Sequence, residues 1–383
     1  MNFERNNLLK IAIIGAGVAG LSVASLLARA GHEVTIFEKN SKISEIGAGI
    51  QISPNGFCVL KEIGLSKSTI KNSISNNSVL ICDYQNGKKL LQFKQGSVLG
   101  NTNFRLMHRA DLIDMLYRSA VSKKVRFNLG QTADAKSLSC RYSFVIAADG
   151  VHSKTRALLN PEQSKKERSD YFAWRAIVPN KINHHDGVRL TIAPKKHVVS
   201  YPIRDGNQLN VVLIQEIENN DFFEWGVKER PEEIKGIFSE FGGDLREGLA
   251  SIETVHKWGL SSHDVALNWA DDNIFLIGDA LHPMLPFLAQ GANAALEDSF
   301  ILANLITRLD SGEAAHKYAE IRKPRLLRLM KQIKNNAWKF HLEHSFLRTV
   351  THSGLRFLDT TFPQSASLPF RWLYNYDVTK LDI

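Results

Sequence analysis

The sequence predicts an α/β protein in which a mostly parallel sheet is interleaved with a second, β-rich domain and followed by helices. A strand, a glycine-rich turn, a helix and a second strand follow one another within residues 10–38. Residues 144–148 and 274–277 are two further apolar runs that are typical of buried strands. A pair of one Asp and one Gly follows each run. Residues 186–216 instead alternate like an antiparallel meander. Pieces of two different domains therefore alternate along the chain.

The bulk composition indicates a globular protein. With 383 residues and 44% hydrophobic content, the chain is long enough for two domains. The net charge is +9, but Lys and Arg are spread along the chain, so we expect no nucleic-acid partner. The densest cationic stretch, 317–339, also carries apolar residues at helical spacing, which favours the solvated face of an amphipathic helix. Those apolar residues are Leu326, Leu327, Leu329 and Ile333.

Three cysteines, Cys58, Cys82 and Cys140, lie far apart and fit no metal-ligand spacing. They predict free buried thiols in a reducing, cytoplasmic compartment, and no metal site. The apolar stretch Leu8–Ala28 is interrupted by three glycines, so it fits a strand, a turn and a helix better than a signal sequence or a membrane span. We therefore expect no integral membrane segment.

The glycine-rich turn has the context of a dinucleotide site. Ile11–Ile14 predicts the first strand, Leu21–Ala30 the helix and Val34–Phe37 the second strand. In such a unit the first glycine makes the turn, the second lets the backbone approach a pyrophosphate, and the third lets helix and strand pack closely. Glu38, 18 positions beyond the last glycine, would accept hydrogen bonds from ribose hydroxyls. The cofactor-binding residues predicted here are Gly15, Ala16, Gly17, Ala19, Gly20, Glu38 and Lys39.

The β-rich part predicts a second sheet. Three strands, 189–192, 197–202 and 209–214, are separated by turn residues, and 79–93 with Asn86-Gly87 at its centre predicts a hairpin that joins them. The expected division of the chain is residues 1–75, 100–170 and 270–383 for the dinucleotide-binding domain with its C-terminal helical region, and 76–99 and 171–269 for the β-rich substrate domain.

Three segments in addition to the glycine-rich turn carry a resemblance to a known family. They are His108–Leu112, Ala148–Ser153 with Arg156, and Gly278–Pro283. Together the four resemble the single-component flavin aromatic hydroxylases, the group that includes para-hydroxybenzoate and salicylate hydroxylases. The resemblance covers nearly the whole chain and implies a Rossmann-like FAD-binding domain with an interleaved β-sheet substrate domain and C-terminal helices. Any one segment by itself would fit a structural turn.

The resemblance also implies the flavin contacts. Asp279 would accept from a ribityl hydroxyl, although a helix-capping aspartate is the structural alternative. The segment from Pro286 to Asn293 leads into an Ala-rich helix, whose free N–H groups would stabilise negative charge on the flavin. Further cofactor-binding residues on this basis are Gly49, Arg109, Asp149, Asp279, Gly291, Ala292 and Asn293.

Other segments resemble the salicylate hydroxylase branch in particular, namely Gly47–Asn55, His282–Asn293 and Trp372–Asp377. The related 6-hydroxynicotinate enzymes carry a histidine at the position of Gln51, which counts against their substrate and makes Gln51 a candidate substrate contact. The resemblance to this branch implies a salicylate-like substrate, but the residues by themselves do not establish one.

Alternation along a strand places His197 and Tyr201 on one face, which resembles the His-x-x-x-Tyr segment of related hydroxybenzoate hydroxylases. The resemblance implies that His197 helps to deprotonate a phenol and that Tyr201 holds its oxygen. An ordinary sheet face is the alternative. Arg175 is a candidate partner for a substrate carboxylate or a structural arginine, and Pro286 completes the candidate catalytic residues.

The implied activity is a monooxygenase cycle. NADH or NADPH reduces FAD, O2 adds at flavin C4a, and the hydroperoxide hydroxylates a small phenolic or carboxylic aromatic. No second dinucleotide fingerprint occurs, so the nicotinamide would visit without a domain of its own. A ubiquinone-precursor hydroxylase or other flavin oxidoreductase, a nicotinamide dehydrogenase and a non-enzymatic FAD-binding module remain alternatives. We expect a monomer or homodimer, and the short 125–144 segment suggests a lost edge element.

Overall fold

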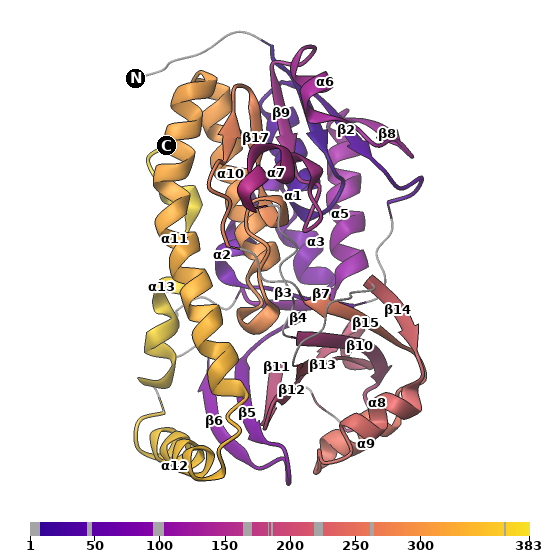
Figure 1. The fold of residues 1–383 in the computed structure, drawn as a ribbon, viewed down its shortest axis with the longest axis vertical. Helices are drawn as coiled ribbons and strands as arrows, with labels where there is room; N and C mark the ends of the chain where they lie inside the picture. Colours follow the sequence, from indigo (N-terminus) through magenta and orange to yellow (C-terminus); the bar gives the residue numbers. More distant parts are fainter. Residues whose placement is uncertain are drawn as a thin grey trace.

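The computed structural model describes residues 8–43, 48–94, 103–163, 171–182, 184, 187–217, 225–260, 264–363 and 365–383. The upper part of Figure 1 holds a six-stranded sheet with its helices, and the lower part an eight-stranded sheet. The long helix α11 (Ser311–Phe340) runs beside both. The α/β class with interleaved sheets and C-terminal helices is therefore confirmed.

The six-stranded sheet has its strands in the order β16-β17-β9-β1-β2-β8. All neighbours are parallel except the edge strand β16. Four of the five residues of β1 are buried, as expected for a parallel strand covered on both faces. The strands are β1 (Lys10–Ile14), β2 (Glu33–Glu38), β8 (Arg126–Leu129), β9 (Phe144–Ala147), β16 (Ala270–Asp271) and β17 (Ile274–Leu276).

The carboxyl ends of β1, β9 and β17 lie side by side, because Ala148 N donates to Ile14 O (2.8 Å) and Ile277 N donates to Ala147 O (3.0 Å). This edge is where parallel sheets bind ligands. The glycine-rich turn, the Asp149-Gly150 pair and the Gly278-Asp279 pair each follow one of these strands. Three segments far apart in the sequence therefore meet at one place.

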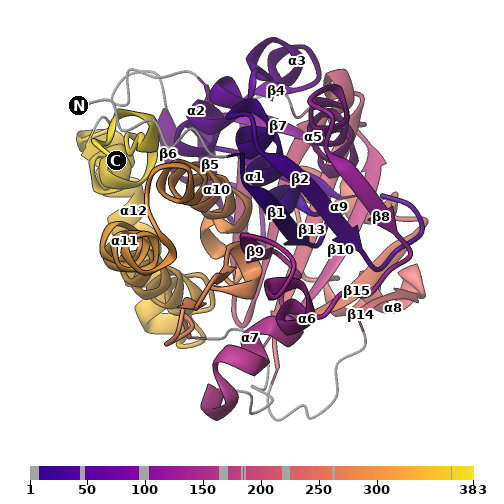
Figure 2. The same cartoon turned by 90° about the horizontal axis from the view of Figure 1, so that it is seen from above.

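Helices α1 (Val18–Arg29), α5 (Arg109–Ser122) and α10 (Gly291–Arg308) pack together against this sheet. Seen from above, α10 and α11 lie side by side, with α12 (Ser345–Thr361) and the C-terminus beyond them (Figure 2). The short helices α6 (Ala135–Ser139) and α7 (Lys154–Leu159) flank β9. In the shortened segment, β8 forms the edge of the sheet and α6 returns the chain to β9.

The eight-stranded sheet has the order β14-β15-β10-β13-β12-β11-β5-β6. The meander is confirmed as β11, β12 and β13, and the hairpin β5–β6 joins the sheet through a parallel pairing of β5 with β11. Helices α8 (Pro231–Ile237) and α9 (Asp244–Ala250) supply part of its core. The strands are β5 (Ser78–Asp83), β6 (Lys89–Lys94), β10 (Tyr171–Pro179), β11 (Gly187–Ala193), β12 (Lys196–Ile203), β13 (Gln208–Glu216), β14 (Trp225–Glu229) and β15 (Val255–Leu260).

A three-stranded sheet, β3-β7-β4, lies between the two larger sheets. It is made of β3 (Gly49–Ile52), β7 (Arg105–His108) and β4 (Ile74–Ser75), and it leads into α2 (Pro54–Ile63) and α3 (Ser66–Lys71). Because β7 packs against β12, this sheet connects the dinucleotide-binding part with the β-rich part.

Helix α11 confirms the amphipathic prediction only in part. Leu326, Leu329 and Ile333 are buried, whereas Leu327 is 51% exposed. The prediction that the cations form a solvated face is wrong for two arginines, which are buried because they pair with acids of α10. Arg322 Nε lies 2.8 Å from Asp298 Oδ1, and Arg325 Nε lies 2.7 Å from Glu297 Oε2.

The three cysteines are free, but only Cys82 is fully buried, and Cys140 is exposed where a buried thiol was predicted. Among the described residues, no helix is both long and apolar enough to cross a membrane. No group of three or more His, Cys, Asp or Glu side chains in the described ranges is arranged to hold a metal ion.

Candidate active site

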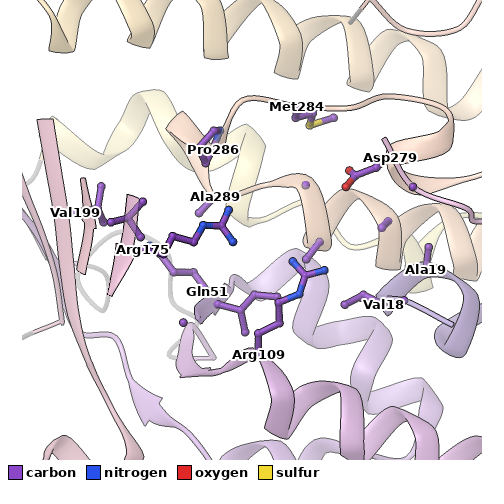
Figure 3. A pocket seen from close by; sticks show the side chains of 18 of the residues that line it. Val18, Ala19, Gln51, Arg109, Arg175, Val199, Asp279, Met284, Pro286 and Ala289 are labelled. Atoms are coloured by element: carbon purple, nitrogen blue, oxygen red, sulfur yellow. The ribbon is translucent and has the colours of Figure 1, made fainter. Parts of the chain in front are cut away.

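A cavity of about 290 Å³ opens between the carboxyl edge of the six-stranded sheet and one face of the eight-stranded sheet. Figure 3 shows that Arg109 and Arg175 point into it with Gln51 near them, and that Asp279 and Met284 approach from the opposite side. Of the predicted site residues, the structure brings eleven to the cavity wall. They are Gly17, Ala19, Gly49, Gln51, Arg109, Arg175, Tyr201, Asp279, Pro286, Gly291 and Ala292.

The three glycines of the turn are needed for different reasons. Gly15 has φ +102°, and a Cβ there would lie 2.4 Å from the Ala148 carbonyl oxygen. A Cβ on Gly20 would lie 2.0 Å from the Gly15 carbonyl oxygen. Gly17 instead faces the cavity, with nothing within 4 Å of an added Cβ. The first and third glycines therefore permit packing, and the second leaves space at the start of α1 for a phosphate group.

This contrast predicts separable effects of two substitutions. Gly17→Val should leave the free energy of unfolding of the FAD-free protein within about 1 kcal/mol of wild type but weaken FAD binding, because the side chain enters the space at the helix start. Gly20→Val should unfold or destabilise the protein because the clash is with backbone. Urea unfolding and FAD fluorescence titration measure the two quantities, and equal effects of both variants would contradict this role for Gly17.

Glu38 closes the turn from the end of β2. Its two carboxylate oxygens accept from the N–H of Ala16 and the N–H of Asn40, both at 2.9 Å. Neither Glu38 nor the exposed Lys39 lines the cavity. The ribose contact remains a prediction, and what the structure adds is that Glu38 holds the glycine-rich turn in shape.

Asp279 directs its carboxylate into the cavity, where it is accessible although protein surrounds it. Burial raises the pKa of this carboxyl, and the electrostatic effects of His282 and Arg109 oppose the shift. Within the described residues its carboxylate accepts no capping hydrogen bond, so the helix-cap alternative is not what the structure shows. An acceptor held in this way suits a hydroxyl-bearing ligand.

Asp149, by contrast, does not reach the cavity. Its carboxylate accepts from the Ser153 hydroxyl at 2.6 Å at the start of α7, while the flanking Ala148 and Gly150 line the cavity. The Asp-Gly segment therefore presents its backbone to the cavity, and the aspartate side chain holds that backbone.

The first residues of α10 form the floor at the other end, where Gly291 and Ala292 line the cavity. Asn293 lies just behind the wall, fully buried. Its Oδ1 accepts from Ser53 N (3.0 Å), and its Nδ2 donates to the Gln51 carbonyl (3.0 Å). Asn293 thus fixes β3 against the start of α10, and positions Gln51 instead of facing the cavity itself.

A buried hydrogen-bond network that the sequence did not reveal supports this contact. Asn55 Nδ2 donates to Gln290 Oε1 (3.0 Å) and to Glu297 Oε1 (2.6 Å), and Gln290 Nε2 donates to the Ser53 hydroxyl (3.0 Å). Nothing in the local sequence marks these residues as partners, because they come from segments about 235 positions apart.

Gly49 is where the small sheet meets the substrate sheet. Its N–H donates to Asn210 Oδ1 at 2.5 Å, and a Cβ would lie 2.6 Å from the Tyr201 hydroxyl oxygen. Only a glycine allows this approach, which brings the start of β3 against β12 and β13.

The third part of the wall is apolar. Val199 of β12, Val212 and Ile214 of β13, and Met284 line it beside Tyr201, Arg175 and Pro286. Burial raises the pKa of Tyr201, and Arg175 opposes this. Sequence reasoning missed Val212, Ile214 and Met284 as site residues, although alternation along β13 places the two β13 residues on one face.

His197 shares the strand face of Tyr201 but does not line the cavity. It is 1% exposed, and its ring packs against Phe287 and Phe340. Its Nδ1 lies 2.6 Å from His341 Nε2. Burial and the neighbouring His341 hold the pKa of His197 well below its ordinary value. The structure therefore places His197 behind the apolar wall, with a histidine partner that the sequence did not suggest.

Comparison with known proteins agrees with this architecture. The model of an FAD binding domain family matches residues 117–333, more than half of the chain, and that of an NAD(P)-binding Rossmann-like domain matches residues 13–54. A 3-amino-4-hydroxybenzoate 2-monooxygenase from Streptomyces cremeus is 30% identical over 361 residues, covering 87% of this chain and 88% of that protein.

A 3-hydroxybenzoate 6-hydroxylase from Klebsiella oxytoca is 27% identical over 384 residues, covering 89% of this chain and 95% of that protein. A solved salicylate hydroxylase substrate complex has the same fold, with a TM-score of 0.77 and 20% identity over 98% of this chain and 97% of that one. These matches favour neither a nicotinamide dehydrogenase nor a simple binding module. The chain belongs to the single-component FAD-dependent aromatic hydroxylases.

Proposed function

We propose that the cavity binds FAD along the carboxyl edge of the six-stranded sheet, and that the apolar end beside it takes a phenolic carboxylic acid. The cavity residues fit FAD: the space at Gly17 suits a pyrophosphate, the Asp279 carboxylate a ribityl hydroxyl, and the start of α10 the flavin ring. When bound, FAD supplies the redox chemistry, taking a hydride from NAD(P)H and reacting with O2.

The protein's own residues bind and orient the cofactor and the substrate and shield them from water. The N–H groups at the start of the 18-residue helix α10 favour negative charge at the Gly291 end of the cavity. The close contact of Gly49 with β12 and the apolar side chains of β12 and β13 exclude water from the substrate end.

The observation that carries the substrate class is an apolar wall with one guanidinium and one phenol. Val199, Val212 and Ile214 suit an aromatic ring, Arg175 suits a carboxylate, and the Tyr201 hydroxyl suits a ring hydroxyl. The Arg175 guanidinium is steadied by the Trp258 ring, 5.0 Å away. Hydroxybenzoates and aminohydroxybenzoates, the substrates after which these relatives are named, have this combination of groups.

The test is a screen of substrate-stimulated NADH and NADPH oxidation with identification of the product. The panel is salicylate, 3-hydroxybenzoate, 3-amino-4-hydroxybenzoate and 6-hydroxynicotinate, each beside a phenol that lacks the carboxylate. We expect at least one benzoate to gain one oxygen atom and the phenols to show much higher KM. Flavin reduction without a hydroxylated product for every acid would overturn the proposal.

Arg175→Met distinguishes the loss of a contact between Arg175 and the substrate carboxylate from a general loss of activity. Loss of a charge-assisted hydrogen bond costs about 1.5–3 kcal/mol, so kcat/KM for the acid should fall about 10- to 150-fold while that for the phenol changes little. Arg189→Met is the matched control, because Arg189 belongs to the same sheet and pairs with Asp244 instead of reaching the cavity. Equal losses for acid and phenol would argue against a carboxylate contact.

A further inference from the structure

Three titratable side chains form a continuous chain behind the apolar wall. His197 Nδ1 lies 2.6 Å from His341 Nε2, and His341 Nδ1 lies 3.1 Å from Glu216 Oε2. They come from β12, the residue after α11 and the end of β13. The His197 and His341 side chains are almost fully buried, whereas that of Glu216 is 37% exposed. The chain therefore runs from the interior to solvent.

The carboxylate determines which nitrogen atoms carry protons. An ionised Glu216 only accepts, so His341 donates through Nδ1–H. A neutral His341 then accepts at Nε2, which requires His197 to donate through its own Nδ1–H. His197 is neutral because burial holds its pKa low, so its Nε2 is left as a bare acceptor. In the described part of the chain this Nε2 makes no hydrogen bond.

His197 lies behind the cavity wall, beside residues that line the cavity. It is directly opposite Ile214 in the β12–β13 pairing and two residues from Val199, and both of these side chains line the cavity. Its ring also contacts Phe287, which follows the cavity residue Pro286. His197 Nε2 is not among the fully enclosed polar atoms without a partner, and it lies beside side chains that line the space proposed for the substrate ring.

We propose that Glu216 and His341 are positioning residues that hold His197 in the Nδ1–H tautomer, with Nε2 as a base for the substrate hydroxyl, and that they conduct its proton to solvent. The kinetic part of this inference rests on the proposed function. The tautomer part depends only on the protein.

The proton transfer balances without any further reactant. The phenol O–H bond breaks and its proton bonds to His197 Nε2, while the Nδ1 proton of His197 passes to His341 Nε2. The Nδ1 proton of His341 passes to Glu216 and leaves to water. The phenolate that remains is more electron-rich than the phenol, which favours oxygen transfer to its ring.

Other titratable residues approach this chain within the described part of the protein. Tyr171 of β10 packs against the His341 ring at 5.5 Å, and Lys195 donates its backbone N–H to the His341 carbonyl. The Lys195 ammonium lies 3.5 Å from Glu343 Oε1. Glu216 is therefore the group whose charge sets the direction of the hydrogen bonds.

The first experiment does not depend on catalysis. Long-range 1H–15N NMR of FAD-loaded protein labelled with 15N-histidine, with signals assigned from His197→Gln and His341→Gln, should show both His197 and His341 as Nδ1–H tautomers. Glu216→Ala should shift His341 towards the Nε2–H form or tautomer exchange, and Glu240→Ala should not. Glu240 is the matched control because it pairs with Lys196, the neighbour of His197, and does not contact either imidazole. A wild-type His197 protonated on Nε2 would overturn the proposal.

The second experiment measures kcat and KM for the panel acid with the highest wild-type kcat/KM. Glu216→Ala and His341→Leu should lower kcat about 10- to 100-fold at pH 7 with little change in KM, as expected for loss of assisted proton transfer. The defect should shrink as pH rises toward the phenol pKa of about 10, because an ionised substrate needs no base.

A kcat defect that persists at high pH would show a merely structural role and overturn the relay, as would equal effects of Glu216→Ala and Glu240→Ala. If the wild type hydroxylates none of the acids while the NMR shows the expected tautomers, the substrate class fails and the hydrogen-bond direction stands.

Discussion

Replacing Arg322 by methionine is expected to lower the free energy of unfolding by about 3–5 kcal/mol. Arg322 is 0% exposed and pairs with Glu297 and Asp298 on α10, both also fully buried. Burial alone would raise the pKa of Asp298, but His282 and Arg322 hold it at about 2. Without the guanidinium, both buried carboxylates lose a counter-charge, which leaves Arg325 beside Glu297 and His282 beside Asp298. Urea unfolding followed by circular dichroism measures the change.

Lys323→Met is the control for this experiment, because Lys323 is the next residue of α11 and is exposed. We expect it to change the free energy of unfolding by no more than about 0.5 kcal/mol. A loss below about 1 kcal/mol for Arg322→Met would mean that the buried pair contributes little to stability. Asn55 donates to Glu297 and so connects this buried network to the residues behind the cavity wall. The affinity for FAD should therefore fall together with the free energy of unfolding.

The second large effect concerns the cofactor. Asp279→Ala is expected to weaken FAD binding about 10- to 150-fold, because it removes a charged acceptor worth about 1.5–3 kcal/mol from the cavity. Nothing in the described protein compensates for the loss, since the carboxylate accepts no protein hydrogen bond there. Titration of the apoprotein with FAD, followed by quenching of flavin fluorescence, gives the dissociation constants.

Asp279→Asn should bind FAD with intermediate affinity, because the amide oxygen still accepts a hydrogen bond but carries no charge. Asp271→Ala is the control, since Asp271 is an exposed aspartate on β16, at the edge of the six-stranded sheet. If Asp279→Ala bound FAD as tightly as Asp271→Ala, the ribityl contact would have to be assigned to another group.

Local patterns predicted the elements well, for physical reasons. The βαβ unit, the meander and the hairpin depend on short-range periodicity and turn residues, and the ends of each predicted element lie within three residues of those in the structure. The prediction for α11 was less accurate. Helical spacing shows which residues share a face, but not that Arg322 and Arg325 meet acids from another helix and become buried.

For Asn293, Asp149 and Glu38 the sequence indicated which segments lie beside the cavity, but not the direction of their side chains. All three bond to nearby protein groups behind the cavity wall. A motif identifies a segment, because backbone geometry near a ligand restricts the residue type. It does not say whether the side chain holds the ligand or the backbone that does.

By itself the sequence determined the fold class, the glycine-rich turn and the family, because each depends on residues close together in the chain or on their order along it. The tertiary structure decided what only long-range contact can decide. It brought Gln51 and Tyr201 to the same cavity, placed Val212 and Ile214 in its wall, and joined His197 to His341, 144 residues away. Contacts between segments so far apart depend on how sheets and helices pack, and no local pattern encodes that packing.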